Sequence, residues 1–305
     1  MNIYFNYGLD LHNTHIYYRY VGIEILRSNF ISARKGVVYF MDDDLLDIEA
    51  LFSIPFPYAL RLWRKATSKR KYILSLSSKL LVSTIYLADK YSSYNPLLLR
   101  PIASGELLIR SWHPNSYIES RSNSVRICYH GSWSHRDDMK WLAPLIAEIQ
   151  RRCANTIFEV IGESRVAQIF KGIPRIIVLP TMAWPDYLKH TQTVRQDIGL
   201  APLRDTLFNR GRGPIKFFDY ARAGAVGVYS AGPAFSDFVS HGVDGIVLEN
   251  DPSLWVERIV ELVNTPQLRQ SMAEAAWLKV LDNSPTSPDI QKYLHELNKA
   301  IEQLA

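Results

Sequence analysis

The sequence has little of what marks secreted, membrane-spanning or metal-binding proteins. Its 305 residues include two cysteines, too few for a disulfide framework, so we expect Cys128 and Cys153 to be buried free thiols. No group of cysteines and histidines has the spacing of metal ligands. No apolar run approaches the roughly 20 residues of a transmembrane helix, and the N-terminus lacks the pattern of a signal peptide. We therefore expect a cytoplasmic protein without a metal.

Positive charge is modest overall but concentrated in one segment. The net charge is +5, and no nucleic-acid recognition motif accompanies it, so we expect no nucleic-acid partner. The segment 61–71 follows Phe56 and Tyr58 and surrounds Trp63, and such a segment could lie on the headgroups of an anionic membrane or meet an anionic acceptor. It could equally be an ordinary solvated face. The basic residues are Arg61, Arg64, Lys65, Lys69, Arg70 and Lys71.

The second half of the chain alternates short apolar segments with helix-like ones. Nearly continuous apolar strands between helices indicate a parallel sheet covered on both faces, which predicts a doubly wound, Rossmann-like domain. The predicted strands are 125–131, 156–162, 175–180, 197–203, 225–231 and 244–250. The predicted helices are 138–153, 164–170, 184–190, 215–224, 234–242, 252–266, 266–281 and 290–304.

The first 118 residues give a less complete pattern. Strands are predicted at 36–44, 79–84 and 96–101, whereas residues 15–28 look helical and residues 1–35 contain no clear strand. Two complete Rossmann-like domains need more than about 350 residues by ordinary domain sizes, so the N-terminal domain looks shortened. The polar, serine-rich segment 104–124 is the expected linker. We expect domains at 1–118 and 119–285, followed by a C-terminal helix at 286–305.

Asp197–Gly224 is the most informative segment. It reads as a buried strand, then a polar loop, then a helix that opens near Pro214. The free N–H groups and the dipole at a helix N-terminus suit a phosphate. Lys216 would add a cation, and Asp219 would accept hydrogen bonds from sugar or ribose hydroxyls. The segment therefore predicts a site for a nucleotide diphosphate.

Together with the strand AVGVYSAGP and the turn HGVDGIVLEND that follow it, this segment resembles the donor-binding domain of GT-B-fold glycosyltransferases, close to the family 4-type group. The resemblance covers about residues 120–280. It implies an α/β protein with two Rossmann-like domains, the C-terminal one complete and the N-terminal one abbreviated. It also implies sugar transfer from a nucleotide-diphosphate sugar to a glycan, lipid-linked or other surface-polysaccharide acceptor. Retention of configuration, no metal or other cofactor, and a peripheral position at the inner face of the membrane are further expectations.

The resemblance also implies roles for individual residues. Lys216 matches the position that approaches the donor diphosphate, and Asp219 matches the second acid of the family's E-x7-E pattern, which holds the ribose hydroxyls. The first acid's position falls on Gly211, a departure from the pattern. Asn209 and Arg210 are the nearest polar substitutes, and Arg212 could serve the phosphates.

Further donor contacts are expected where the predicted strands end. A glycine turn after the first strand would bring the backbone close to the diphosphate, because a Cβ would obstruct that approach. His135 and Arg136 stand in for the family's basic pair, and the turn after the third strand is where this fold places the base. The remaining candidates are Gly131 and Gly162 for the nucleotide and Leu179, Pro180 and Thr181 for the base.

Asp42, Asp43 and Asp44 are the candidate catalytic residues of the N-terminal domain. They follow an apolar strand directly, at the edge where open α/β sheets bind ligands, and one of them could orient or deprotonate an acceptor hydroxyl. The alternative is that they cap and open a helix. Gly211 and the short N-terminal domain also favour an alternative function, that of a non-catalytic protein that binds a nucleotide sugar or glycan. A nucleotide-sugar epimerase is a third possibility.

Overall fold

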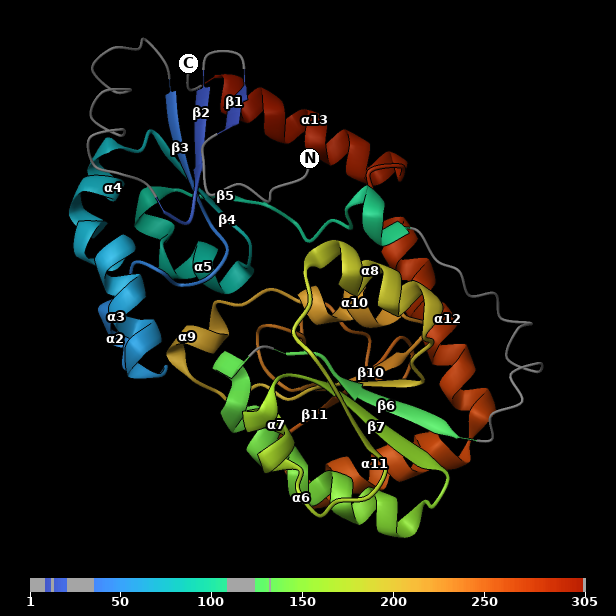
Figure 1. Cartoon of the computed structure of the whole chain (residues 1–305). Coiled ribbons are helices and arrows are strands. Elements are labelled where there is room, and N and C mark those ends of the chain that lie inside the picture. Colours follow the sequence, from blue (N-terminus) through green and yellow to red (C-terminus); the bar gives the residue numbers. More distant parts are fainter. Residues whose placement is uncertain (1–8, 12–13, 21–35, 109–123, 132, 304–305) are drawn as a thin grey trace. The chain divides into compact units, whose positions relative to one another are not determined.

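The protein divides into two compact units that do not follow a single break in the sequence. The computed structural model describes residues 9–11, 14–20, 36–108, 124–131 and 133–303 (Figure 1). The first unit takes Met1–Ser104, Asp205–Gly213 and Pro285–Ala305, and the second takes Gly105–Arg204 and Pro214–Ser284. Residue 118, the expected boundary, lies outside the described residues. The expected division assigned 205–213 to the second domain and treated 286–305 as a separate helix.

The first unit is built on a sheet in the order β1-β2-β3-β4-β5, in which β1 and β2 are antiparallel and the other neighbours are parallel. The strands are β1 (Leu9–Leu11), β2 (Thr14–Tyr18), β3 (Gly36–Met41), β4 (Lys79–Val82) and β5 (Leu97–Leu98). The helices are α2 (Ile48–Leu51), α3 (Phe56–Lys65), η1 (Thr67–Lys69), α4 (Arg70–Leu76), α5 (Ile85–Lys90), η2 (Ser92–Tyr94), α9 (Leu207–Arg210) and α13 (Pro288–Glu302).

Strand β3 shows how this sheet is buried on both faces. Alternate side chains of a strand point to opposite faces. Val37, Tyr39 and Met41 pack in a cluster with residues of α2, α3, α4, α5 and α9. Val38 and Phe40 pack on the other face in a cluster that contains Ile301 of α13. The C-terminal helix therefore completes the core of the N-terminal unit.

The prediction for the start of the chain was wrong at residues 14–18. These residues form β2, which pairs in parallel with β3 from Thr14–Gly36 to Tyr18–Phe40. Their run of β-branched and aromatic side chains suits a strand, and pairing with β3 overrides the helix-like periodicity. The rest of the predicted helix, from residue 21, lies outside the described residues.

The second unit contains all six predicted strands, paired in parallel in the order β11-β10-β9-β6-β7-β8. The strands are β6 (Val125–Tyr129), β7 (Thr156–Ile161), β8 (Ile176–Leu179), β9 (Ile198–Ala201), β10 (Val226–Ser230) and β11 (Ile246–Leu248). The helices are η3 (Gly105–Leu108), η5 (Trp133–His135), α6 (Arg136–Arg152), α7 (Ser164–Ile169), α8 (Trp184–Thr193), α10 (Ile215–Arg222), α11 (Pro252–Asn264) and α12 (Pro266–Asp282).

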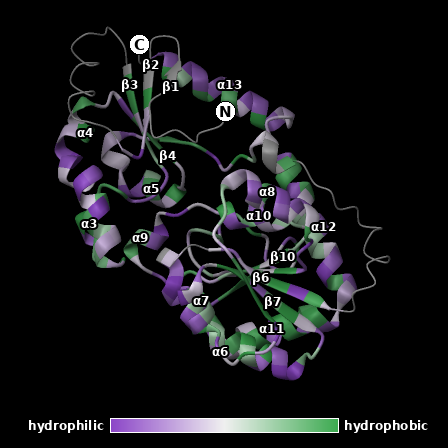
Figure 2. Cartoon of the chain, viewed as in Figure 1, coloured by the Kyte–Doolittle hydropathy of each residue, from purple (hydrophilic) through white to green (hydrophobic). Residues whose placement is uncertain are grey.

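Helices cover both faces of this sheet, as the nearly continuous apolar strands predicted. Figure 1 shows α6, α7 and α11 on one face and α8 and α10 on the other. Figure 2 shows that the strands are mainly hydrophobic. Ile127 and Tyr129 of β6 share a core with Ile146 of α6 and Trp255 of α11. The Rossmann-like prediction for this part of the chain is confirmed.

The predicted helix at 234–242 was wrong. Residues 233–238 form hydrogen-bonded turns, in which the Gly232 carbonyl accepts from both Phe235 and Ser236. Gly232 and Gly242 both have positive φ angles, of 141° and 80°. A helix cannot continue through a residue with such an angle, so any helix here would be confined to the few residues between the two glycines.

Candidate functional site

A pocket of about 450 Å³ opens at the carboxyl ends of the strands in the second unit. Strand order reverses between β6 and β9, and open α/β sheets bind their ligands at such a switch point. The lining comes from the turn after β6, the ends of β7 and β8, and from α8 and α10. The lining residues are His130, Gly131, Ile161, Thr181, Met182, Trp184, Tyr187, Lys216 and Asp219.

Helix α10 brings Lys216 and Asp219 to this pocket. The helix sits close on β9 because Gly199 leaves room for the ring of Tyr220, which a Cβ there would approach to 2.3 Å. The Lys216 ammonium donates to the main-chain carbonyl of His130 and lies 3.7 Å from the Asp219 carboxylate. The site therefore presents a cation and a buried carboxylate side by side near a helix N-terminus.

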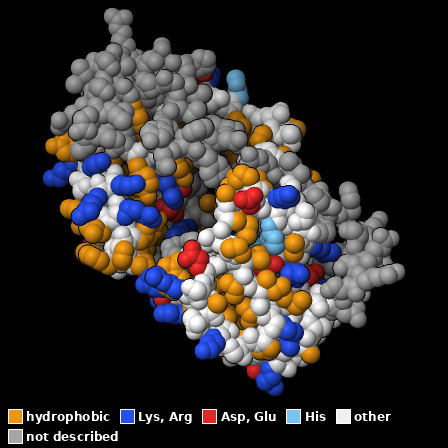
Figure 3. All heavy atoms as spheres, viewed as in Figure 1, with side chains coloured by type: hydrophobic (Ala, Val, Ile, Leu, Met, Phe, Trp, Pro, Cys, Tyr) orange, Lys and Arg blue, Asp and Glu red, His pale blue; other side chains and the backbone are white. Residues whose placement is uncertain are grey.

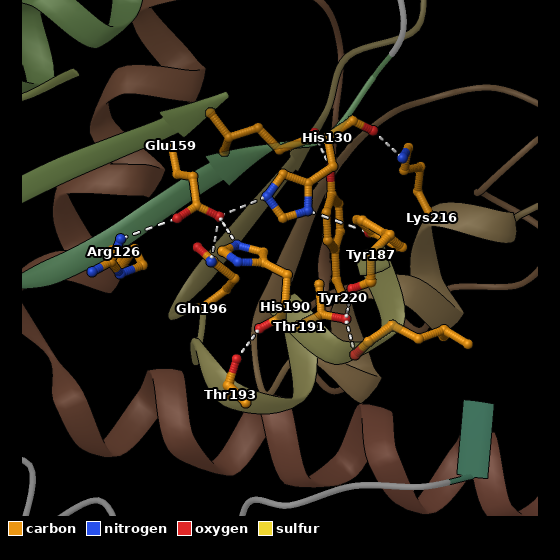
Figure 4. Close-up of polar contacts among 12 residues, drawn as sticks. Arg126, His130, Glu159, Tyr187, His190, Thr191, Thr193, Gln196, Lys216 and Tyr220 are labelled. Carbon is orange, nitrogen blue, oxygen red and sulfur yellow. Dashed lines mark hydrogen bonds and ion pairs between the residues drawn. The ribbon is translucent and has the colours of Figure 1, made fainter. Parts of the chain in front are cut away.

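Behind the pocket, a buried carboxylate accepts four hydrogen bonds (Figure 4). The Glu159 side chain on β7 is 1% exposed. Its Oε1 atom accepts from His130 Nε2 at 3.0 Å, His190 Nε2 at 2.9 Å and Gln196 Nε2 at 2.7 Å. Its Oε2 atom accepts from Arg126 at 3.0 Å. We call Glu159 with these four partners the Glu159 cluster.

The protonation states of the cluster follow from its contacts. Burial alone would raise the pKa of Glu159, but the hydrogen bonds with His130 and His190 lower it to about 2. Burial lowers the pKa of His130, against the opposing effect of Glu159. A neutral His130 that donates from Nε2 to Glu159 must accept at Nδ1, and the Tyr187 hydroxyl lies 3.3 Å from that atom.

An aromatic pair closes the other side of the pocket. The rings of Trp184 and Tyr187 on α8 stack with centroids 5.6 Å apart and planes 29° apart. Thr181 and Met182, from the turn after β8, complete this wall. A flat aromatic surface beside backbone and hydroxyl groups can bind a ring with polar edges, such as a nucleobase.

Several predicted site residues have structural partners instead of a place in the pocket lining. A Cβ on Gly162 would lie 2.2 Å from Val166, so this glycine lets α7 pack against β7. His135 Nδ1 lies 3.0 Å from the Asp138 carboxylate, and Arg136 begins α6 beside Asp137. Leu179 and Pro180 are likewise outside the lining, which takes only Thr181 from this turn. Gly131 does line the pocket, and a Cβ there would lie 2.8 Å from the Tyr129 ring.

The polar loop between β9 and α10 belongs to the first unit. Phe208 of α9 is fully buried there and meets the Tyr58 ring edge-on. Arg210 forms an exposed ion pair with Asp205, and the Arg212 guanidinium lies 4.0 Å from Asp43. Neither these arginines nor Asn209 are among the residues that line the pocket.

Gly211, at the position of the missing acid, packs tightly inside the first unit. A Cβ there would lie 3.1 Å from both the Cβ and the backbone N of Asp44, and 3.3 Å from Leu87. The Asp44 side chain is fully buried. An acidic side chain at position 211 would therefore be crowded by Leu87 and would lie next to the carboxylate of Asp44.

The three consecutive acids of the first unit are all engaged. Asp42 accepts from the Tyr18 hydroxyl and from Arg19, both at 2.6 Å, and Arg19 also pairs with Asp43. Asp44 pairs with Lys90 at 2.6 Å and accepts from Tyr91. Because Asp44 has no exposed side-chain surface, Asp42 and Asp43 remain the candidates for contact with an acceptor.

The sequence reasoning did not select the Glu159 cluster or the aromatic wall. One signal was available: Glu159 interrupts the apolar strand TIFEVI, and a buried acid requires partners. Across the described residues, no group of three or more His, Cys, Asp or Glu side chains is arranged to hold a metal ion. None of the helices in this part of the chain has the length and apolar character to cross a bilayer.

Comparisons with known proteins agree with this geometry. Residues 124–265 match the family of glycosyl transferases group 1. The fold is similar to that of sucrose-phosphate synthase from Thermosynechococcus elongatus, with a TM-score of 0.70 and 8% identity over 96% of this chain and 74% of that one. No curated protein sequence gives a match.

Two further structures extend the comparison. The pneumococcal O-GlcNAc transferase GtfA, in complex with UDP and GlcNAc, has a TM-score of 0.62 and 12% identity over 92% of this chain, which spans 54% of that protein. WaaG, a glycosyltransferase involved in lipopolysaccharide biosynthesis, has a TM-score of 0.57 and 16% identity over 80% of this chain and 70% of that one. The GT-B fold expected from the sequence is confirmed.

The low pKa of Glu159 predicts a specific dependence of stability on pH. A group whose folded pKa lies below its unfolded value stabilises the protein above the unfolded pKa and loses that contribution as pH falls. For Glu159 the loss runs from pH 4.5 down to about 2 and amounts to about 3 kcal/mol. Chemical denaturation measures the free energy of unfolding of wild type and of Glu159→Gln across this range. As pH falls, the difference between the two free energies should decrease by that amount. A constant gap would contradict an ionised Glu159.

The packing at Gly211 predicts that restoring an acid there will not restore a donor contact. We expect Gly211→Glu to lower the free energy of unfolding by about 1–3 kcal/mol through overpacking, with no gain in nucleotide affinity by calorimetry. Gly213→Glu is the matched control, because its Cβ would have only Thr84 within 4 Å, at 3.9 Å. Tighter nucleotide binding by Gly211→Glu alone would refute this interpretation.

Proposed function

We propose how the pocket of this glycosyltransferase is used, from the premise that residues 124–265 match the glycosyl transferases group 1 family. The donor is a nucleotide-diphosphate sugar bound in the pocket of the second unit. The acceptor is a glycan, a lipid-linked sugar or another surface polysaccharide. The observation that carries the proposal is that Lys216 and Asp219 line one pocket at the switch point of the sheet.

In this proposal the diphosphate lies against Lys216 and the N-terminus of α10. Transfer of the sugar leaves a nucleoside diphosphate with developing negative charge on its terminal phosphate. A preorganised ammonium and free helix N–H groups stabilise that charge more strongly than water does. Such a site needs no metal ion, and the resemblance to family 4-type enzymes favours retention of configuration.

The remaining lining suits the two ends of the donor. The Asp219 side chain is 8% exposed, and its carboxylate would accept hydrogen bonds from ribose or sugar hydroxyls. Trp184 and Thr181 would hold the base. UDP is the first nucleotide to test, since the pneumococcal neighbour was solved with UDP and GlcNAc. An acceptor in polysaccharide or lipopolysaccharide assembly is supported by WaaG, which acts in lipopolysaccharide biosynthesis.

The first unit would supply the acceptor side. The side chains of Asp42 and Asp43 are 16% and 11% exposed, and either carboxylate could orient an acceptor hydroxyl. We propose orientation of the acceptor as their role.

Gly211 favours a second candidate, a non-catalytic protein that binds a nucleotide sugar. Transfer and hydrolysis assays with UDP-, GDP- and dTDP-sugars, run beside calorimetric binding of the same compounds, separate the two. Turnover with a polysaccharide acceptor supports the transferase. Binding without turnover on any acceptor supports the non-catalytic protein.

Removal of the Lys216 ammonium should weaken donor binding. A charge-assisted hydrogen bond contributes about 1.5–3 kcal/mol, so Lys216→Ala should raise the dissociation constant of UDP, or of the nucleotide that binds best, by roughly 10- to 100-fold. Lys140→Ala, at an exposed lysine of the same unit, is the matched control and should bind normally. Equal affinity in Lys216→Ala and wild type would refute the assignment of the pocket.

We further propose that the first unit docks on an anionic membrane surface through α2, α3 and α4. Hydrophobic side chains are exposed there, with Phe52 at 82%, Phe56 at 76% and Trp63 at 44%. Arg61, Arg64, Lys65, Arg70 and Lys71 are exposed in the same segment. Figure 3 shows basic and hydrophobic side chains side by side over these helices. Aromatic groups that enter the headgroup layer, next to cations that pair with anionic lipids, are typical of interfacial binding.

Charge removal in this segment should reduce membrane binding. Each basic residue near an anionic surface contributes about 1 kcal/mol, so replacing Arg61, Arg64 and Lys71 by glutamine should lower partitioning into the membrane by roughly 100-fold. The measurement is cosedimentation with vesicles containing phosphatidylglycerol, compared with pure phosphatidylcholine. Replacing Lys140, Lys171 and Lys189, which are exposed on the second unit, is the control for net charge. Equal losses in both triple variants would argue against a defined docking surface.

A further inference from the structure

The Glu159 cluster links separate parts of the second unit to the pocket. One buried carboxylate receives donors from β6, from α8 and from the segment before β9. Two of the residues that it organises, His130 and Tyr187, also line the pocket. The cluster and the pocket therefore share a wall.

His130 connects the cluster to the cation of the site. Both ring nitrogens of its buried imidazole are engaged, Nε2 by Glu159 and Nδ1 by Tyr187. Its main-chain carbonyl accepts from the Lys216 ammonium on the pocket side. The next residue, Gly131, has no side chain that could anchor the turn. Figure 4 shows the imidazole between Glu159 and Tyr187, and the His130 carbonyl bound by Lys216. We infer that the imidazole fixes the strand end whose carbonyl binds Lys216.

We propose that Glu159 is a positioning residue of the donor site. It holds the His130 imidazole in one orientation and one tautomer, and through the His130 carbonyl it fixes where the Lys216 ammonium is held. His190, Gln196 and Arg126 keep the carboxylate in place. The proposal rests on the proposed function, because it assigns Lys216 to the donor diphosphate.

The same arrangement also positions α8. Tyr187 on this helix bonds to His130 and stacks on Trp184, while His190, one turn further along, bonds directly to Glu159. Loss of the carboxylate therefore frees the aromatic wall as well as the turn after β6. The donor should then bind less tightly at both its diphosphate and its base.

A double-mutant cycle tests whether Glu159 acts through Lys216. Calorimetry of UDP, GDP and dTDP identifies the nucleotide that binds, and its affinity is then measured for Glu159→Gln, Lys216→Ala and the double variant. We expect about a tenfold loss for Glu159→Gln, and a double variant only about twofold weaker than Lys216→Ala, because coupled residues are not additive. Multiplied losses in the double variant would overturn the assignment.

Asp244→Asn is the matched control for a purely structural effect. Asp244 is also a buried acid of the second unit, 4% exposed, and it accepts from the Ser240 backbone and from Lys279, both at 2.8 Å. It does not line the pocket. Its replacement should lower the melting temperature while nucleotide affinity stays within about twofold of wild type. Equal losses of affinity in Asp244→Asn and Glu159→Gln would reduce Glu159 to a structural role.

The protonation state of His130 in the wild-type protein provides a second measurement, which does not depend on nucleotide affinity. Nitrogen-15 NMR of the imidazole rings, assigned with His130→Gln, should show a neutral His130 with its proton on Nε2. An imidazolium, or a proton on Nδ1, would overturn the proposal. If wild type binds none of the three nucleotides, the proposed function is wrong, and so is the positioning role of Glu159 that rests on it. Normal wild-type binding with additive losses overturns the role of Glu159 alone.

Discussion

The second unit depends on one constraint: the charge of Glu159 lies inside the protein and must be matched there. An isolated buried carboxylate costs several kcal/mol, and four donors from three separate parts of the second unit offset that cost. To reach one carboxylate, these donors must occupy fixed positions relative to β7. One of the donors, His130, also lines the pocket. The hydrogen bonds that stabilise the Glu159 charge therefore also position the wall of the pocket.

Much of this fold could be predicted from the sequence because it depends on local patterns. Six apolar strands alternate with helices, and each strand appears in the sheet at its predicted place. Lys216 and Asp219 were also predictable, since a loop and a helix N-terminus are local features. The Glu159 cluster was not, because Glu159 meets His130, His190 and Gln196 across 29, 31 and 37 residues. Periodicity does not specify which distant side chains will meet.

Two failures of prediction have the same cause. Residues 14–18 form a strand because β3 lies beside them, and residues 205–213 join the first unit because Phe208 enters its core. Both outcomes are decided by tertiary packing, which overrides local propensity. The second also bears on Gly211: a Cβ there would lie 3.1 Å from Asp44, so a side chain would require its neighbours to shift. The departure from the family's pattern thus falls at a tightly packed position of the first unit.

The position of helix α13 at the end of the chain affects the order in which the two units can fold. The sheet of the first unit consists of residues from the first hundred of the chain, yet one of its faces is covered by Ile301 and Leu297 of this helix. During synthesis that face remains uncovered until residues 288–302 have left the ribosome, whereas residues 125–284 already contain every strand of the second sheet. Because domains fold as units as they emerge, the second unit can be complete before the first unit has its full core. The contacts of Ile301 and Leu297 with this sheet can therefore form only at the end of synthesis, and the core of the N-terminal unit is the last to be completed.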